Sequence, residues 1–298
     1  MKHLININDL DKGEIQKLFI QASILNENTN TSELLKGKSV ANVFFENSTR
    51  TLISFELAAK KLGADVINVN IAKSSTQKGE TLRDTLQTLQ AMGIDAFVIR
   101  HSDNGICEKI KSWLNKDTIL INAGDGNNQH PTQALLDCYT ILQHKQNIIA
   151  LKIAIIGDIK HSRVASSLID CLNILGNKNV FIYGPKLLLP NSSSKANICN
   201  DFDEAITGAD VIVMLRIQKE RIEQDIPEID NYHENFGLNR DALKKANKEC
   251  IVMHPGPINR GVEISSELAD NSPSVILEQV ANGVLIRQAI LVRLFSDI

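Results

Sequence analysis

The stretch Phe44-Phe45-Glu46-Asn47-Ser48-Thr49-Arg50-Thr51 joins a segment typical of a buried strand to a segment typical of a helix. Residues 39–45 are mainly small, β-branched or aromatic and contain neither Pro nor Gly, which indicates a strand. Beyond the stretch, apolar residues recur at helical spacing until Gly63, where a helix would end. These apolar residues are Leu52, Phe55, Ala59 and Leu62. The stretch therefore marks a strand-to-helix junction, the unit from which α/β folds are built.

Three hydroxyl groups and one guanidinium meet at this junction, in Ser48-Thr49-Arg50-Thr51. The first turn of a helix presents unpaired N–H groups and the positive end of the helix dipole. The hydroxyls add further donors, and Arg50 offers a fork of donors shaped for an oxyanion. A simpler interpretation is that Ser48 or Thr49 only caps the helix, but capping uses one hydroxyl and leaves the others unexplained. The stretch therefore predicts a phosphate-type anion site formed without a glycine-rich loop.

The composition indicates a two-domain globular protein whose positive charge is gathered locally. The chain has 298 residues, of which 43% are hydrophobic and only 4% aromatic, so its cores must be mainly aliphatic. A net charge of −3 argues against a nucleic acid as the main partner. The five cysteines are scattered without paired spacing, as expected for reduced core residues of a cytoplasmic protein rather than metal ligands. The N-terminus lacks an apolar signal segment and no apolar run could span a bilayer, so we expect no membrane association.

Strand-like and helix-like segments alternate along both halves of the chain. We expect strands at residues 39–45, 65–69, 96–100, 118–122, 151–156, 179–183, 209–215 and 250–253. We expect helices at residues 9–25, 51–62, 80–92, 106–114, 132–143, 164–175 and 280–295. This alternation predicts two doubly wound α/β domains, each with a parallel sheet and helices on both faces. The expected domains are residues 1–134 plus 282–298 and residues 135–281, with the active site in the cleft between them and a closing C-terminal helix.

Residues 122–133 form a second informative stretch, rich in Gly and Asn, which we expect to be a loop after a strand. Its Gly-x-Gly pair lacks the third glycine of a dinucleotide-binding fingerprint. Pro131 suits the first turn of a following helix, because its missing N–H would be unpaired there. His130 and Gln133 would then lie at a helix start on the carboxyl edge of the sheet, where α/β folds bind ligands. A loop histidine that bonds only to backbone is the simpler alternative, but the neighbouring Gln133 favours a ligand site.

Arginines follow several of the expected strands within a few residues, so they can converge at the carboxyl edges of the two sheets. They are Arg50 and Arg100 in the first half, and Arg163, Arg216 and Arg221 in the second. Guanidinium groups gathered in one cleft repel one another unless they bind anions, whereas a single surface arginine is usually only solvated. We therefore expect substrates with several negative charges, a phosphate on the first domain and carboxylates on the second. Glu46 is expected to be a counter-charge that bridges to Arg163 or Arg221 when the domains close.

Several motifs, in their order along nearly the whole chain, resemble those of the aspartate/ornithine carbamoyltransferase family. They are Ser48-Thr49-Arg50-Thr51 with Ser54-Phe55-Glu56, Lys78-Gly79-Glu80-Thr81, His130-Pro131-Thr132-Gln133 and His254-Pro255-Gly256-Pro257. Residues 122–133 and 216–221 are similar to those of the aspartate-specific members. The His-Cys-Leu-Pro and Ser-Met-Gly motifs expected of ornithine-specific members are absent, and Pro255 follows His254.

The resemblance implies a transferase, without metal or cofactor, that moves the carbamoyl group of carbamoyl phosphate to the amine of L-aspartate. The products would be N-carbamoyl-L-aspartate and phosphate, in de novo pyrimidine biosynthesis. The resemblance also implies a homotrimer whose subunits share active sites. Association of trimers with one another or with other chains of the pathway stays open.

The same resemblance assigns roles to individual residues. Phosphate would be bound by Ser48, Thr49, Arg50, Thr51 and Arg100. The carbamoyl oxygen would be polarised by Thr51, Arg100 and His130. The carbamoyl NH2 group would be held by Gln133 and by the backbone carbonyls of Pro255 and Gly256. Aspartate would be bound by Arg163, Arg216 and Gln218. Ser74 and Lys78 would reach carbamoyl phosphate from a neighbouring subunit, and Lys78 would also contact aspartate and act in catalysis.

Three positions depart from the family pattern, and three other functions are weighed against the main one. Leu52 stands where a basic residue often follows the first motif, Gly256 replaces a Leu of some members, and Val164 replaces a Thr. A carbamoyltransferase for another amino acid such as ornithine is the first alternative, but the pair of Arg163 and Arg216 favours a dicarboxylate. A nucleotide-binding oxidoreductase is weakened by the missing third glycine. A catalytically silent assembly subunit is disfavoured because every expected polar group is present.

Overall fold

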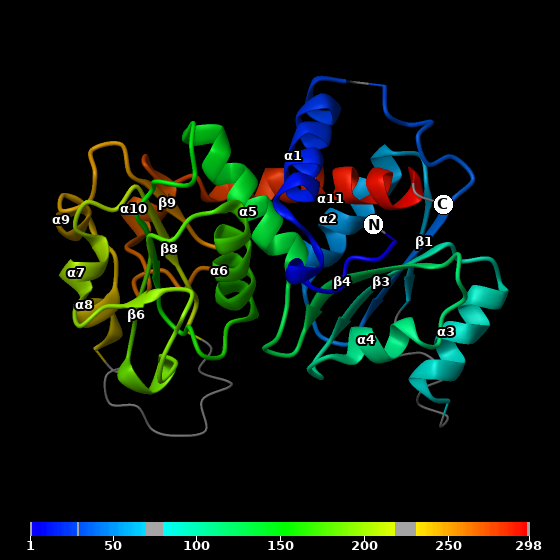
Figure 1. Ribbon diagram of the computed structural model, residues 1–298, viewed down its shortest axis with the longest axis horizontal. Coiled ribbons are helices and arrows are strands. Elements are labelled where there is room, and N and C mark those ends of the chain that lie inside the picture. The colour runs from blue at the N-terminus through cyan, green and yellow to red at the C-terminus, as the bar shows by residue number, and fades with distance from the viewer. Residues whose placement is uncertain (1, 29, 70–79, 218–230, 297–298) are drawn as a thin grey trace. The chain divides into compact units, whose positions relative to one another are not determined.

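The computed structural model describes residues 2–28, 30–69, 80–217 and 231–296, and the chain divides into two compact units (Figure 1). The N-terminal unit consists of Met1–Leu136 and Ala281–Ile298, and the middle unit of Asp137–Val280. Helices α5 (Pro131–His144) and α11 (Ile276–Ser296) each contribute residues to both units. Each unit holds one parallel sheet, so the predicted fold class of two α/β domains with a C-terminal helix is confirmed.

The sheet of the N-terminal unit has parallel strands in the order β2-β1-β3-β4. Its strands are β1 (Ser39–Phe44), β2 (Asp65–Val69), β3 (Ala96–His101) and β4 (Ile119–Asp125). Phe44 at the end of β1 is in register with Arg100, and His101 at the end of β3 is in register with Asp125. The strands β1, β3 and β4 therefore end side by side at one edge of the sheet.

Helices cover both faces of this sheet (Figure 1). They are α1 (Lys12–Glu27), α2 (Thr49–Lys61), α3 (Leu82–Ala91) and α4 (Ile106–Lys111), with a 3-10 turn η1 (Ile7–Asp9) ahead of them. On one face, Leu86 of α3 and Ile110 of α4 pack with Ala41, Val43 and Phe97 of the sheet. On the other face lie α1, α2 and the C-terminal part of α11. This is the doubly wound arrangement that strand–helix alternation predicts.

The middle unit has parallel strands in the order β7-β6-β5-β8-β9. The strands are β5 (Ile153–Ile156), β6 (Val180–Tyr183), β7 (Asn197–Ile198), β8 (Val211–Met214) and β9 (Ile251–Met253). The shorter helical segments are η4 (Lys186–Leu188), α7 (Phe202–Ile206), α8 (Tyr232–Phe236), α9 (Arg240–Leu243) and α10 (Ser266–Asp270), and the longest is α6 (Arg163–Leu175).

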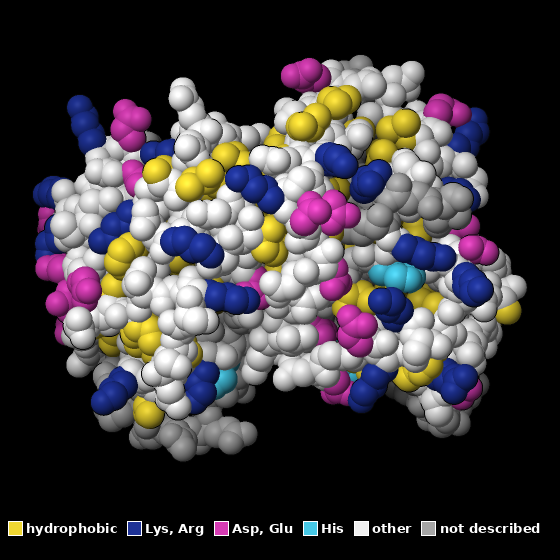
Figure 2. Space-filling view, viewed as in Figure 1, with side chains coloured by type: hydrophobic (Ala, Val, Ile, Leu, Met, Phe, Trp, Pro, Cys, Tyr) yellow, Lys and Arg dark blue, Asp and Glu magenta, His cyan; other side chains and the backbone are white. Residues whose placement is uncertain are grey.

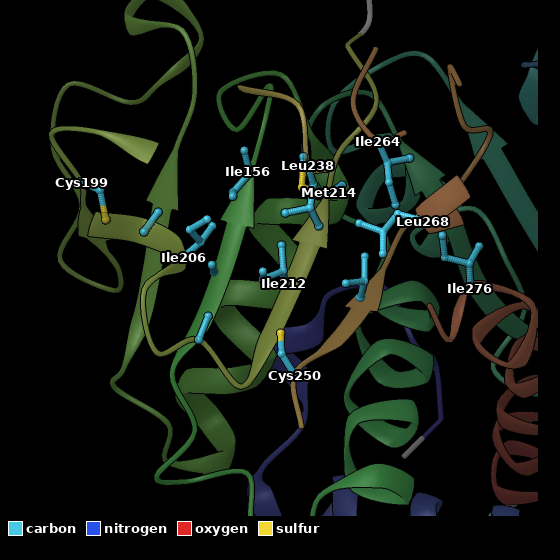
Figure 3. Close-up of a cluster of buried hydrophobic side chains, with 14 residues drawn as sticks. Ile156, Cys199, Ile206, Ile212, Met214, Leu238, Cys250, Ile264, Leu268 and Ile276 are labelled. Carbon is cyan, nitrogen blue, oxygen red and sulfur yellow. The ribbon is translucent and has the colours of Figure 1, made fainter. Parts of the chain in front are cut away.

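Aliphatic side chains fill the space between the second sheet and two of its short helices (Figure 3). Ile156, Ile212 and Met214 of the strands pack there with Ile206 of α7 and Leu268 of α10. Helix α6 lies on the other face of the sheet (Figure 1). The core is therefore aliphatic and the sheet is covered on both faces, as the composition and the alternation predict.

Several segments differ from the expectation drawn from the sequence. Residues 123–125, expected to be a loop, continue β4, because Asp125 still pairs in register with His101 of β3. Next to them, the buried Asn122 side chain donates to the backbone carbonyl of Ile5 at 2.9 Å. This hydrogen bond satisfies a polar side chain inside the sheet. The C-terminal helix begins at Ile276 rather than at residue 280. Helices α7 and α10 were not expected, because five residues are too few to show a helical period.

All five cysteines are free and buried, in agreement with the reduced core residues predicted from the sequence. Burial raises the pKa of Cys199 to about 11 and that of Cys250 to about 12, so both thiols stay protonated at neutral pH. Within the described ranges, no helix has the length and apolar character needed to cross a bilayer.

Two glycines at helix ends allow a matched test of the fold. Gly63 follows α2 with a φ of +85°, and a Cβ there would lie 1.8 Å from the backbone oxygen of Ser32. Gly93 follows α3 with a φ of +97°, but nothing lies within 4 Å of its Cβ position.

We predict that Gly93→Ala lowers the free energy of unfolding by about 1–2 kcal/mol, the cost of the left-handed conformation alone. Gly63→Ala should lower it by more, because the backbone at Ser32 must also move. Urea unfolding followed by circular dichroism measures both losses. Equal losses for the two variants would contradict the close packing of α2 against Ser32.

Candidate functional site

The predicted anion site lies where β1 ends and α2 begins. Ser48 occupies the N-cap position of α2, but its side chain forms no capping hydrogen bond. Its Oγ donates instead to Oγ1 of Thr51 at 3.0 Å, and Oγ of Ser54 donates to the backbone carbonyl of Thr51 at 3.0 Å. Thr51 is buried, whereas Thr49 and Arg50 are exposed. The simple capping interpretation is therefore wrong for Ser48, whose hydroxyl is not committed to the first N–H groups of α2.

Arg100, near the end of β3, contacts the chain that leaves β1 and the end of β4. Its Nε lies 3.4 Å from Oε2 of Glu46, and its Nη1 donates to the backbone carbonyl of Ala123 at 3.1 Å. Both charged side chains are mostly buried, 14% and 20% exposed, so water weakens their attraction only in part. Glu46 thus pairs with Arg100 of its own unit. The expected bridge from Glu46 to Arg163 or Arg221 on domain closure stays a prediction.

The turn between β4 and α5 places His130 and Gln133 at a helix start. The N–H of Asp125 donates to the carbonyl of Gln129 at 3.1 Å, and the N–H of Gln129 donates to Oδ1 of Asp125 at 3.0 Å. These two bonds close the turn. His130 is 4% exposed, and its carbonyl accepts from the N–H of Gln133 at 3.0 Å, which opens α5. The predicted position of both residues, at the start of a helix after a strand, is confirmed.

Three neighbouring strand ends thus gather the predicted residues of the N-terminal unit. Ser48–Thr51 follows β1, Arg100 lies near the end of β3, and His130 with Gln133 follows β4. The group combines hydroxyl, guanidinium and imidazole side chains with the N-termini of α2 and α5. Such a set of donors suits a tetrahedral oxyanion.

Arg287 on α11 is not among the site residues predicted from the sequence. It is 3% exposed, and its Nη1 and Nη2 donate to the carbonyl of Gly283 at 2.9 Å and to Oγ1 of Thr132 at 3.4 Å. Its guanidinium carbon lies 4.9 Å from the ring centre of Phe55. A buried cation therefore links α11 to α2 and to the first turn of α5. Arg287 interrupts the apolar stripe that includes Ile290, and this interruption is the signal that could have identified it.

In the middle unit, Arg163 and Arg216 follow the neighbouring strands β5 and β8. Arg163 is the first residue of α6 and is 6% exposed, and the Ser162 side chain caps that helix by accepting a backbone hydrogen bond at 3.2 Å. The fully buried carboxylate of Asp158 accepts from the N–H of His161 at 3.1 Å and lies 3.0 Å from its Nδ1. Arg216 is partly buried. Because β5 and β8 are paired, the two arginines belong to one sheet edge.

Pro255 and Gly256 follow β9, the strand next to β8. The preceding His254 is fully buried, and its N–H donates to Oε1 of Gln279 at 3.0 Å. Its Nδ1 accepts from the N–H of Gly256 at 2.9 Å. Gly256 has a φ of +68°, a conformation that favours glycine over the leucine of some family members. The turn holds the carbonyls of Pro255 and Gly256 at the sheet edge that also carries Arg163 and Arg216.

Several predicted residues lie outside the described ranges, namely Ser74, Lys78, Gln218 and Arg221. Within the described ranges, no group of three or more His, Cys, Asp or Glu side chains could hold a metal ion. On the face shown in Figure 2, basic side chains are spread among acidic ones and form no continuous basic patch. The described arginines that are candidates for ligand binding lie at the two sheet edges.

Two family models match this chain along most of its length. The model of the aspartate/ornithine carbamoyltransferase, carbamoyl-P binding domain, matches residues 2–143. The model of the aspartate/ornithine carbamoyltransferase, Asp/Orn binding domain, matches residues 150–294. The aspartate carbamoyltransferase catalytic subunit of Xanthomonas campestris pv. campestris (strain B100) is 44% identical over 299 residues, which cover 98% of this chain and 95% of that protein.

Solved structures with the same fold include two aspartate transcarbamoylases. The enzyme from Trypanosoma cruzi in complex with N-(phosphonacetyl)-L-aspartic acid is 30% identical with a TM-score of 0.89, over 98% of this chain and 95% of that one. The catalytic subunit of the M. jannaschii enzyme is 36% identical with a TM-score of 0.88, over 100% of this chain and 99% of that one.

We predict that Arg50→Ala weakens the binding of inorganic phosphate by at least about tenfold, since a charge-assisted hydrogen bond contributes about 1.5–3 kcal/mol. Arg240→Ala is the matched control, because Arg240 is an arginine of α9 paired with Glu267 at 2.5 Å. Isothermal titration calorimetry with phosphate measures both variants. Equal affinities of Arg50→Ala and the unaltered protein would show that Arg50 does not hold the anion.

Proposed function

The chain belongs to the aspartate/ornithine carbamoyltransferase family, and from this premise we propose that it transfers the carbamoyl group of carbamoyl phosphate to L-aspartate. The products are N-carbamoyl-L-aspartate and phosphate, as in de novo pyrimidine biosynthesis. The observation that carries the proposal is the division of the predicted residues between the two sheets. The edge of one sheet suits a phosphate, and the edge of the other presents two arginines that suit two carboxylates.

Phosphate binding is assigned to the start of α2 and the end of β3. The first N–H groups of α2 and the hydroxyls of Ser48, Thr49 and Thr51 donate to the phosphate oxygens. Arg50 and Arg100 supply the positive charge that stabilises the phosphate as it leaves as a dianion. The ion pair between Glu46 and Arg100 supports this role, because it fixes the direction of the Arg100 guanidinium.

Carbonyl activation is assigned to Thr51, Arg100 and His130. The neutral amine of aspartate forms a bond to the carbamoyl carbon, and negative charge develops on the carbamoyl oxygen. Donors that already point at this oxygen stabilise that charge without reorganisation. The bond between the carbamoyl carbon and the bridging phosphate oxygen then breaks, and the amine proton passes to the departing phosphate.

The carbamoyl NH2 group donates hydrogen bonds, so its binding is assigned to acceptor groups. The donors that activate the carbonyl cannot take this role. Gln133 offers its side-chain oxygen, and Pro255 and Gly256 offer backbone carbonyls. The tight turn at His254 supports this assignment, because it fixes the backbone of both residues. Orienting the carbamoyl group in this way reduces the entropy lost when the amine attacks.

Aspartate binding is assigned to Arg163, Arg216 and Gln218. Two guanidinium groups can each pair with one carboxylate of a dicarboxylic amino acid. Ornithine carries an ammonium group where aspartate carries its second carboxylate. Since a second cation near Arg163 and Arg216 would be repelled, the arginine pair favours aspartate over ornithine.

The domain roles follow from the same proposal. Residues 1–134 with 282–298 bind carbamoyl phosphate, and residues 135–281 bind aspartate. The matched family models carry the corresponding descriptions, which supports this division of labour. We further propose a cytoplasmic homotrimer in which Ser74 and Lys78 complete the site of a neighbouring subunit. The free, buried cysteines fit a reducing compartment.

The proposed reaction is tested by supplying carbamoyl phosphate with aspartate or ornithine side by side. We predict that kcat/KM for aspartate exceeds that for ornithine by at least about a hundredfold, because ornithine offers no second carboxylate to pair with Arg163 and Arg216. Chromatographic detection of the carbamoylated amino acid measures both rates. Faster carbamoylation of ornithine would contradict the proposed substrate.

Shared active sites are tested by mixing two inactive variants. Lys78→Ala and Arg50→Ala are each expected to lose most activity, because each removes a cation proposed to contact the phosphate. When the two are unfolded, mixed and refolded together, some sites receive both an intact Lys78 and an intact Arg50. We predict a partial return of activity in this mixture and none when either variant is refolded alone. The absence of any return would show that each site is built from one chain.

A further inference from the structure

Glu263 is a buried carboxylate that the proposed reaction does not use. It follows the turn after β9, and its side chain is 0% exposed. Its Oε1 accepts from the N–H of Ile217 at 3.0 Å and from Nδ2 of Asn259 at 2.7 Å. Its Oε2 accepts from the N–H of Asn259 at 2.9 Å. The Glu263 backbone is fixed as well, because its carbonyl accepts from the N–H of Leu238 at 2.9 Å.

The partners of Glu263 belong to two different strand exits. Ile217 directly follows Arg216 at the exit of β8. Asn259 lies in the turn that begins with Pro255 and Gly256 at the exit of β9. One carboxylate therefore ties the segment that carries Arg216 to the segment that carries the two backbone carbonyls.

The cost of burying a carboxylate indicates that Glu263 does more than fill space in the core. Burial raises the pKa of Glu263, because desolvation disfavours its charged form, while the hydrogen bonds from Ile217 and Asn259 act in the opposite direction. His254 approaches Glu263 from the end of β9, with its Nε2 3.9 Å from Oε2. An apolar side chain of similar volume would fill the space without the cost of desolvating a charge. It could not, however, accept the backbone N–H groups of two separate segments.

We propose that Glu263 is a positioning residue for aspartate binding, which sets the place of Arg216 relative to the turn at Pro255 and Gly256. The proposal rests on the function proposed above, since it concerns the residues assigned there to aspartate and to the carbamoyl NH2 group. In this role Glu263 acts on Arg216 through the backbone of Ile217 and does not contact the substrate.

The geometry distinguishes Glu from Gln at this position. In Glu263→Gln, the amide oxygen can keep the Oε1 position and accept from Ile217 and Asn259. The amide NH2 group then replaces Oε2 and faces the N–H of Asn259, so one hydrogen bond is lost and two donors oppose each other. Glu267→Gln is the matched control, because Glu267 lies on the adjacent helix α10 and is 65% exposed.

The first readout is steady-state kinetics of Glu263→Gln and Glu267→Gln. We predict that Glu263→Gln raises the KM for aspartate about tenfold, in keeping with the loss of one charge-assisted hydrogen bond, while the KM for carbamoyl phosphate changes less than about threefold. Asn259→Ala, which removes only the bond from Nδ2, should raise the aspartate KM by a smaller factor. A Glu263→Gln enzyme whose aspartate KM stays within about twofold of the unaltered enzyme would overturn the proposal.

The second readout needs no activity. Amide hydrogen exchange followed by NMR should show faster exchange at Ile217 and Asn259 in Glu263→Gln, by about tenfold or more, with little change at Val213 inside β8. Unchanged exchange at both amides would overturn the proposal even if kinetics were altered.

The two readouts separate failure of this inference from failure of the proposed function. If the unaltered protein does not carbamoylate aspartate, the proposed function is wrong. Unchanged amide exchange at Ile217 and Asn259 in Glu263→Gln would then also refute the connection that Glu263 makes between the two segments. If the unaltered protein is active and Glu263→Gln behaves like Glu267→Gln, only the inference is wrong. Asn259→Ala keeps the buried carboxylate and its two backbone hydrogen bonds. This variant therefore serves as the control for a general loss of folding.

Discussion

Parallel pairing of neighbouring strands is the constraint on which the site depends. In a parallel sheet every strand leaves at the same edge, so residues far apart in the sequence are brought to one place. Pairing of β1 with β3 and of β3 with β4 does this for Arg50, Arg100 and His130. Pairing of β5 with β8 and of β8 with β9 does it for Arg163 and Arg216 and for the turn after β9. The residue types at the strand ends therefore determine the chemistry of each sheet edge.

Each edge combines positive charge with a few carboxylates that hold it in place. In the N-terminal unit, Glu46 pairs with Arg100, while Arg287 is held by backbone, hydroxyl and aromatic partners. In the middle unit, Asp158 and Glu263 are fully buried and accept hydrogen bonds from backbone N–H groups. By accepting from backbone amides, these two acids fix the loops at the sheet edge that also carries Arg163 and Arg216. An overall negative chain can in this way present local sites for anionic substrates.

Local signals in the sequence predict most of the fold and the residue types of the site. Helix ends at Gly63 and Gly176 were predictable because both adopt a positive φ that other residues avoid. Partners were not predictable, because they depend on contacts between distant segments. Residues 123–125 resemble a loop in the sequence, but pairing of Asp125 with His101 of β3 extends β4 to include them. The contact between Glu46 and Arg100 likewise depends on the pairing of β1 with β3, which charge alone does not reveal.

We propose that arginines of both units bind a single pair of substrates. A crystal structure with N-(phosphonacetyl)-L-aspartate tests this proposal most directly, because the compound joins a phosphonate to an aspartate in one molecule. Arg50 is expected to contact the phosphonate, and Arg216 to contact a carboxylate of the same bound molecule. A bound analogue that touches Arg50 while Arg216 faces away from it would contradict the proposal.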